Sequence, residues 1–190
     1  MILLLAILAG LAAGLIRARL AGQSYPPVQL QHVWLVILSI LPQFLAFYWP
    51  VTRELMPAWL VVMCLVGSQA GLLAFVVLNR EYIELWIVGG GLTANLIVIA
   101  ANRGLMPITP ASVAAIYPGL HLDASWLGSQ LGWTKNILLL QADTHFAFLS
   151  DRILLPGWVP WKYAFSLGDL LIMLGVFWLL WRGAAGKRRA

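Results

Sequence analysis

Two aspartates are spaced so that they could act together as an acid and a base. Asp151 lies between two apolar segments, and Asp169 follows it by eighteen residues, inside another apolar stretch. We expect both at the same membrane interface, where two neighbouring carboxylates cannot both ionise and therefore share a proton. One would then activate a water molecule while the other protonates the leaving group at a scissile carbonyl. This chemistry, that of an aspartic peptidase, makes Asp151 and Asp169 the candidate catalytic residues.

Each aspartate also has a purely structural interpretation. Ser166 and Asp169 have the spacing of a capping box, and an acid at the third helical position is favoured by the helix dipole. Gly168, just before Asp169, suits the close approach of another element or of a ligand. Asp151 could be a solvated loop acid paired with a nearby arginine, which contributes little to stability. The sequence leaves both interpretations open.

Two asparagines are candidate substrate-binding or orienting residues. Asn95 lies within an apolar run, where an unpaired amide would be costly, so it is expected to bind a neighbouring helix or a substrate. Asn102 ends the same run and could orient a substrate or cap the helix, because asparagine tolerates the left-handed conformation.

Metal and cofactor sites are not expected. Asp143 and His145 provide two ligands, fewer than a structural or catalytic metal site needs. The run Gly89–Gly91 lacks the lysine or hydroxyl residue of a phosphate-binding loop. We therefore predict no metal and no cofactor.

The composition places these residues in a membrane protein. Of 190 residues, 62% are hydrophobic and 10% are charged, with a mean hydropathy of +0.87, whereas soluble domains have about 25% charged residues. Nineteen charged side chains cannot cover a soluble protein of this size, so a water-soluble enzyme is excluded. The net charge of +5 does not indicate a nucleic-acid partner, because most basic residues follow apolar runs, as topology determinants do.

Five apolar runs are the predicted membrane spans, and together they define the fold class. A span needs about 20 helical residues. We predict an all-α, polytopic transmembrane bundle that forms a single membrane domain over residues 1–190. Within the first run, Gly10 and Gly14 would let another helix approach closely. The predicted spans cover residues 1–16, 33–49, 58–78, 83–101 and 166–181.

A long segment, residues 102–165, joins the fourth and fifth runs on the outer side. Thr109 and Pro110 predict the start of a short helix that ends before Pro118. The apolar stretches 124–133 and 136–142 predict further short helices lying in the interface. A sixth inserted segment over 136–149 is disfavoured by its polar residues.

Basic residues predict that the amino terminus lies outside and the carboxyl terminus inside. This orientation leaves five basic residues on the outer side, and positive charge is enriched on the cytoplasmic side of membrane proteins. We expect a multi-pass protein of the bacterial cytoplasmic (inner) membrane, with the lipid bilayer as its first partner and a membrane protein or a lipoprotein-like substrate as a second. The seven inner basic residues are Arg17, Arg19, Arg80, Arg182, Lys187, Arg188 and Arg189.

Two resemblances refine these expectations. Residues 101–107 and 165–169 resemble a family of bacterial polytopic membrane proteins classified only as a domain of unknown function. Residues 90–97 resemble the Gly-Asn-Leu-Ile helix of lipoprotein signal peptidase (signal peptidase II), and Asp151 and Asp169 resemble its two catalytic aspartates. The peptidase has Asp-Arg directly after Asn-Leu-Ile, where this chain has Val98 and Ile99.

The second resemblance implies an intramembrane aspartic hydrolase acting at the outer leaflet, with Asp151 and Asp169 as its acid pair and Asn95 or Asn102 orienting the substrate. The alternative is a non-catalytic membrane subunit or a small transporter.

Overall fold

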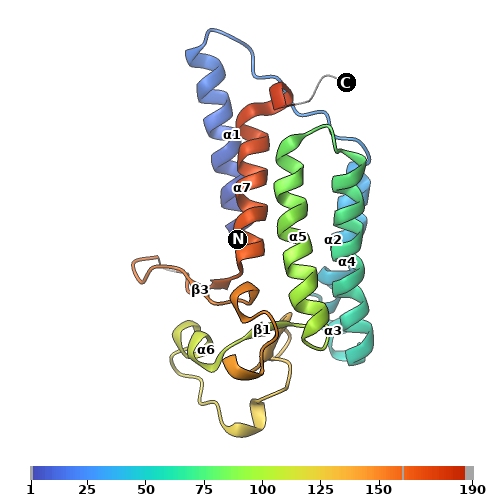
Figure 1. Cartoon of the computed structure of the whole chain (residues 1–190), viewed down its shortest axis with the longest axis vertical. Coiled ribbons are helices and arrows are strands. Elements are labelled where there is room, and N and C mark those ends of the chain that lie inside the picture. Colours follow the sequence, from blue (N-terminus) through green and yellow to red (C-terminus); the bar gives the residue numbers. More distant parts are fainter. Residues whose placement is uncertain (1, 160, 187–190) are drawn as a thin grey trace.

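The structure, a computed structural model, describes residues 2–159 and 161–186. Met1 of the first predicted span and the basic residues Lys187, Arg188 and Arg189 lie outside the described residues. The described chain is mostly helical, and its long helices lie side by side (Figure 1). They are α1 (Ile2–Leu20), α2 (Val33–Phe47), α4 (Ala58–Leu78), α5 (Ile83–Ala101) and α7 (Leu167–Arg182).

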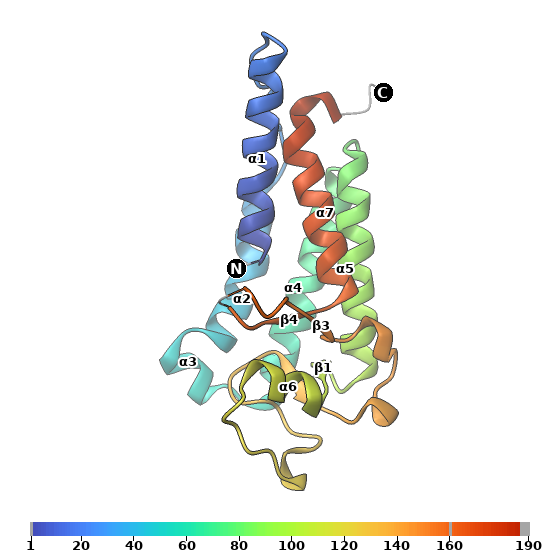
Figure 2. The same cartoon turned by 90° about the vertical axis from the view of Figure 1, so that its left-hand side faces the viewer.

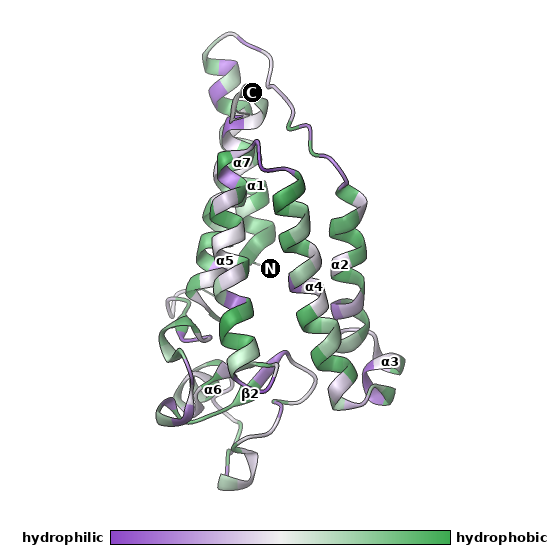
Figure 3. Ribbon diagram, turned by 45° about the vertical axis from the view of Figure 1, so that its right-hand side comes forward, coloured by the Kyte–Doolittle hydropathy of each residue, from purple (hydrophilic) through white to green (hydrophobic). Residues whose placement is uncertain are grey.

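Three of these helices are long and apolar enough to cross a membrane, namely α1, α4 and α5. Helices α2 and α7 occur where spans are predicted but contain 15 and 16 residues. Hydrophobic residues dominate the long helices, whereas hydrophilic residues gather at their ends and in the connecting segments (Figure 3). The chain therefore has the apolar helices of a membrane protein.

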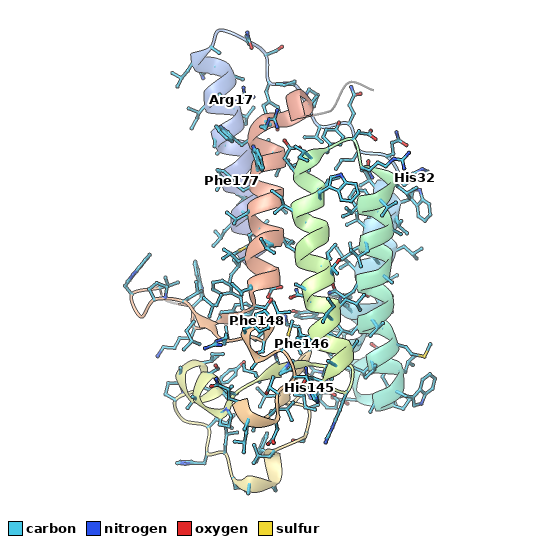
Figure 4. All side chains as sticks on the ribbon, in the orientation of Figure 1. Arg17, His32, His145, Phe146, Phe148 and Phe177 are labelled. Atoms are coloured by element: carbon cyan, nitrogen blue, oxygen red, sulfur yellow. The ribbon has the colours of Figure 1, made fainter. Side chains whose placement is uncertain are left out.

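The long helices are held together by close contacts at glycine. A Cβ atom on Gly10 would lie 2.7 Å from the carbonyl oxygen of Phe177, and one on Gly14 would lie 2.6 Å from that of Leu180. Gly10 and Gly14 therefore form a packing face, as predicted, and the partner is α7. Figure 2 shows α1 and α7 side by side, and Figure 4 shows Phe177 on α7 facing α1.

An ion pair between a buried glutamate and a partly exposed arginine joins α5 to α7 at the end of the bundle where α7 ends. Arg182 Nη1 donates to Glu84 Oε1 at 2.9 Å, and the Glu84 side chain is fully buried. Nearby, the last carbonyl groups of α7 accept hydrogen bonds from Arg17 and from the Tyr25 hydroxyl. These donors satisfy carbonyl groups that a helix end leaves unpaired.

The segment 102–165 folds into a cap at the opposite end of the bundle, where α2 ends, α3 (Pro50–Leu55) lies and α4 begins (Figure 1). It contains α6 (Pro110–Ile116), which Thr109 caps by accepting a hydrogen bond from the Ser112 backbone, as predicted. It also contains a parallel pair, β1 (Met106–Ile108) with β2 (Asn136–Leu138), and an antiparallel pair, β3 (Ile153–Leu154) with β4 (Ala164–Phe165).

The prediction of helices throughout the cap is wrong. Residues 136–138 form a strand, and Ala124–Trp126 is only a single 3₁₀ turn. The expected all-α class is corrected to a mostly helical fold with two small sheets. Short apolar runs do not distinguish a strand from a helix, and here the hydrogen bonds to β1, thirty residues earlier in the chain, decide the outcome.

Candidate functional site

Asp151 and Asp169 meet around one lysine at the boundary between the cap and the helices. Lys135 Nζ lies 3.3 Å from Asp151 Oδ2 and 3.7 Å from Asp169 Oδ2. The two Oδ2 atoms are therefore no farther apart than the sum of these distances. We call these three residues the charge cluster.

The β1–β2 pair brings Lys135 and Asp151 together. The Met106 N–H donates to the Lys135 carbonyl, and the Asp151 N–H donates to the carbonyl of Pro107, so both residues flank β1. From β2, Asn136 Nδ2 donates to Asp151 Oδ2 at 2.8 Å. A three-residue strand thus positions a cation and a carboxylate that are sixteen residues apart in the sequence.

Asp169 is positioned by the first turn of α7 and by α5. Ser166 and Asp169 form the predicted capping box, in which the Ser166 hydroxyl accepts from the Asp169 N–H and Asp169 Oδ2 accepts from the Ser166 N–H. Asn95 Nδ2 donates to Asp169 Oδ1 at 2.8 Å, and Asn95 Oδ1 accepts from the Ser166 hydroxyl. Gly168 lies so close to Asn95 that a Cβ atom there would clash, which confirms the predicted close approach.

The two carboxylates have different surroundings. The Asp151 side chain is 2% exposed, whereas that of Asp169 is 25% exposed. Burial raises the pKa of Asp151, while the Lys135 ammonium opposes this shift. Asp151 Oδ1 is buried and accepts no hydrogen bond within the described part of the chain. Asp151 is thus suited to hold a proton.

Lys135 stays charged in this site. Burial alone would lower its pKa, but the carboxylates of Asp151 and Asp169 outweigh burial and raise the pKa above its ordinary value. Tyr163, close enough to feel the Lys135 charge, has its pKa raised by burial. The three charges of the cluster sum to −1 when both carboxylates are ionised, and to zero when Asp151 carries a proton.

Two cavities adjoin the charge cluster. The larger, about 430 Å³, lies within the cap against the end of α2, and its walls include Asp151. The smaller, about 180 Å³, lies between the starts of α1 and α7, and its walls include Asp169. Lys135 and Tyr163 line both. The larger cavity has the size of a small-molecule site.

Of the two predicted orienting asparagines, only Asn95 contacts the charge cluster. Asn102 Nδ2 donates to the carbonyls of Val98 and His145, and Asn102 Oδ1 accepts from the His145 N–H. Asn102 thus joins the end of α5 to the cap near His145, which Figure 4 shows beneath the end of α5. Its side chain holds the cap in place.

Sequence reasoning missed Lys135, Asn136 and Tyr163. In the sequence, Lys135 was considered only as one of the five basic residues on the predicted outer side. Lysine occurs only three times in the chain, and Lys135 directly precedes an apolar stretch. A lysine in that position is a signal for a buried ion pair, because its charge needs a partner near the apolar phase.

Three helices that are long and apolar enough to cross a membrane, together with a folded cap, are typical of a helical membrane protein. It belongs to DUF5317, a family of unknown function, whose model matches residues 27–181. The matched region includes the whole charge cluster and confirms the predicted resemblance to a domain of unknown function. No curated protein and no solved structure matches the chain significantly.

Proposed function

We propose that all five long helices cross the cytoplasmic membrane of a bacterium, with the start of α1 and the cap on the outer side. Arg17, Arg19, Arg80 and Arg182 lie at the end of the bundle opposite the cap, which supports this orientation by the positive-inside rule. Helices α2 and α7 are short for the hydrocarbon core, and local thinning of the bilayer or snorkelling arginines accommodate such lengths.

The charge cluster is then a hydrolytic site at the outer membrane interface. The observation that carries this proposal is that two carboxylates of unlike exposure share one ammonium group at the wall of a cavity. Pairs of acids whose environments differ in this way commonly divide into a proton donor and a proton acceptor.

The roles follow from the surroundings of each group. Asp169 removes a proton from a water molecule, whose oxygen attacks the substrate carbonyl carbon while the carbonyl electrons move onto its oxygen. An ammonium has three N–H donors, and two carboxylates leave one of them for this oxyanion. The carbonyl then re-forms, the bond from carbon to the leaving nitrogen breaks, and that nitrogen takes the proton held by Asp151. One proton then passes from Asp169 to Asp151 through water, which restores the starting state of both groups.

Cleavage of a lipid-anchored peptide in vesicles tests this proposal. The substrate carries an acyl anchor at one end and a fluorophore and quencher on either side of the peptide segment nearest the anchor. We expect Asp151→Asn and Asp169→Asn each to lower the cleavage rate at least about 10²-fold, as loss of a general acid or base does. Asp143→Asn is the matched control, because this carboxylate is exposed elsewhere in the cap.

Thermal unfolding in detergent checks that each variant is folded. Cleavage that is equally fast in the wild type and both aspartate variants would refute the hydrolytic site. A folded wild-type protein that does not cleave the lipid-anchored peptide would refute it as well.

A non-catalytic membrane subunit is the second candidate, because the Asp169 carboxylate is already engaged within the protein. Its Oδ1 accepts from Asn95, and its Oδ2 accepts from the Ser166 N–H and contacts Lys135. If the protein is such a subunit, Asp169→Asn lowers the unfolding temperature. The wild type and both aspartate variants then cleave no substrate.

A further inference from the structure

We infer that the smaller cavity beside the charge cluster binds a single acyl chain of an amphiphile from the outer leaflet, with its polar head at Lys135. This inference rests on the membrane placement and the function proposed above for the same site.

The charge cluster forms the boundary between the two cavities. Asp151 faces the larger cavity, Asp169 faces the smaller, and Lys135 and Tyr163 belong to the walls of both. A ligand that occupies both cavities would therefore pass directly beside the two carboxylates and the ammonium group. Such a ligand would place the bond between its chain and its head next to the reacting groups.

The smaller cavity has the chemistry of a chain site. Apart from Lys135, Tyr163 and Asp169, its walls are apolar, formed by Ile2 and Leu3 of α1, Phe165, and Ile172 and Met173 of α7. Its volume is about 180 Å³, less than half that of the larger cavity. We therefore assign a single acyl chain to it.

The position of the smaller cavity explains how a chain would reach it. It opens between the first turns of α1 and α7, and large apolar side chains of both helices, such as Leu4, Leu171 and Leu174, are exposed. In a membrane these side chains contact lipid, so a chain would enter sideways from the bilayer. No passage through water is needed.

The larger cavity has the chemistry of a head-group site. Lys162 adds an ammonium group to its walls, so that together with the charge cluster the site carries +1 when Asp151 holds a proton. Aromatic side chains, including Trp133 and Tyr48, complete its lining. This balance of charge favours an anionic head group, which decides the choice of probe.

Photocrosslinking in vesicles tests the chain site. The protein is reconstituted in phosphatidylethanolamine and phosphatidylglycerol with a trace of lysophosphatidylglycerol that carries a diazirine in its acyl chain. After illumination, mass spectrometry locates the label. We expect label on the first turns of α1 and α7, and a several-fold loss of that label in Leu3→Trp and in Met173→Trp, because the indole fills the cavity.

The chain offers a matched control for each variant. Leu4 and Leu174 are the next residues on the same helices, are exposed, and do not line the cavity. Leu4→Trp and Leu174→Trp should therefore keep the wild-type labelling. Equal labelling in all four variants, or label spread evenly along the exposed faces of α1 and α2, would overturn the inference.

The same variants separate this inference from the proposed hydrolysis. Labelling that Leu3→Trp abolishes, in a protein that cleaves nothing, supports the chain site and refutes hydrolysis. Cleavage that requires Asp151 and Asp169, together with labelling that Leu3→Trp leaves unchanged, supports hydrolysis and overturns the chain site alone.

Discussion

Lys135 determines what the two aspartates can do. Without it, two neighbouring carboxylates would compete for a single proton. With it, each carboxylate contacts an ammonium group, so the two carboxylates can lie close together without a proton between them. The expected shared-proton pair is thus replaced by a three-residue cluster in which the cation occupies the place of the shared proton.

The raised pKa of Asp151 predicts how stability depends on pH. Because the folded protein binds the Asp151 proton more tightly than the unfolded chain, this residue stabilises the fold below its unfolded pKa of about 3.9. The stabilisation is lost as the pH rises through the higher folded pKa. The contribution of Lys135 is constant over this range, since its pKa is raised and the group is charged throughout.

Unfolding of the wild type and of Asp151→Asn in detergent, at a series of pH values upward from 4, measures this effect. The stability of the wild type relative to the variant should fall as the pH rises, because the amide does not titrate. Asp143→Asn, at an exposed carboxylate of the cap, is the control for the loss of a charge. A relative stability that rises with pH would contradict the assignment of the proton to Asp151.

At the scale of elements, we expect alanine substitutions at two adjacent glycines of α5 to change the unfolding free energy in opposite directions. A Cβ atom on Gly91 would lie 2.8 Å from Ile172 Cγ1 and would clash with the Gly168 carbonyl of α7, whereas a Cβ atom on Gly90 would meet nothing within 4 Å. Gly91→Ala should lower the unfolding free energy by roughly 1–3 kcal/mol through overpacking. Gly90→Ala should raise it by about 0.5–1 kcal/mol, because alanine favours the helix.

Chemical unfolding of both variants in detergent micelles provides the measurement. Equal effects of the two substitutions would show that α5 and α7 are not in close contact at Gly91.

The helices could be predicted from sequence and the cap could not. The predicted runs 58–78 and 83–101 coincide with α4 and α5, because long apolar segments with at most one charged residue have few alternatives. The strands of the cap contain two or three residues each, and their pairing depends on segments far apart in the sequence. The same limit applies to the site, because Asp169 and Asn95 lie on predicted helices whereas Lys135 reaches the cluster only through β1–β2 pairing.

At the scale of the whole molecule, the proposed orientation can be tested with single cysteines. Cys64 is the only native cysteine and is replaced by alanine. Trp158→Cys places a thiol on a highly exposed residue of the cap, and Gln23→Cys places one in the linker at the opposite end. We expect a membrane-impermeant maleimide to label Trp158→Cys in intact cells and Gln23→Cys only after permeabilisation. The reverse pattern would invert the orientation and place the charge cluster on the cytoplasmic side.

Polar contacts at both ends of α7 restrict how this molecule can move. Asn95 holds Asp169 and Ser166 at the cap end, and Glu84 holds Arg182 at the other, so both anchors of α7 lie on α5. A piston-like slide of α7 along α5 would break both anchors at once, and the freed charges would have to enter an apolar phase. Helices α5 and α7 are therefore expected to move together as one rigid unit. Any opening toward the bilayer falls to the start of α1, because at its other end Arg17 donates to the last carbonyl groups of α7.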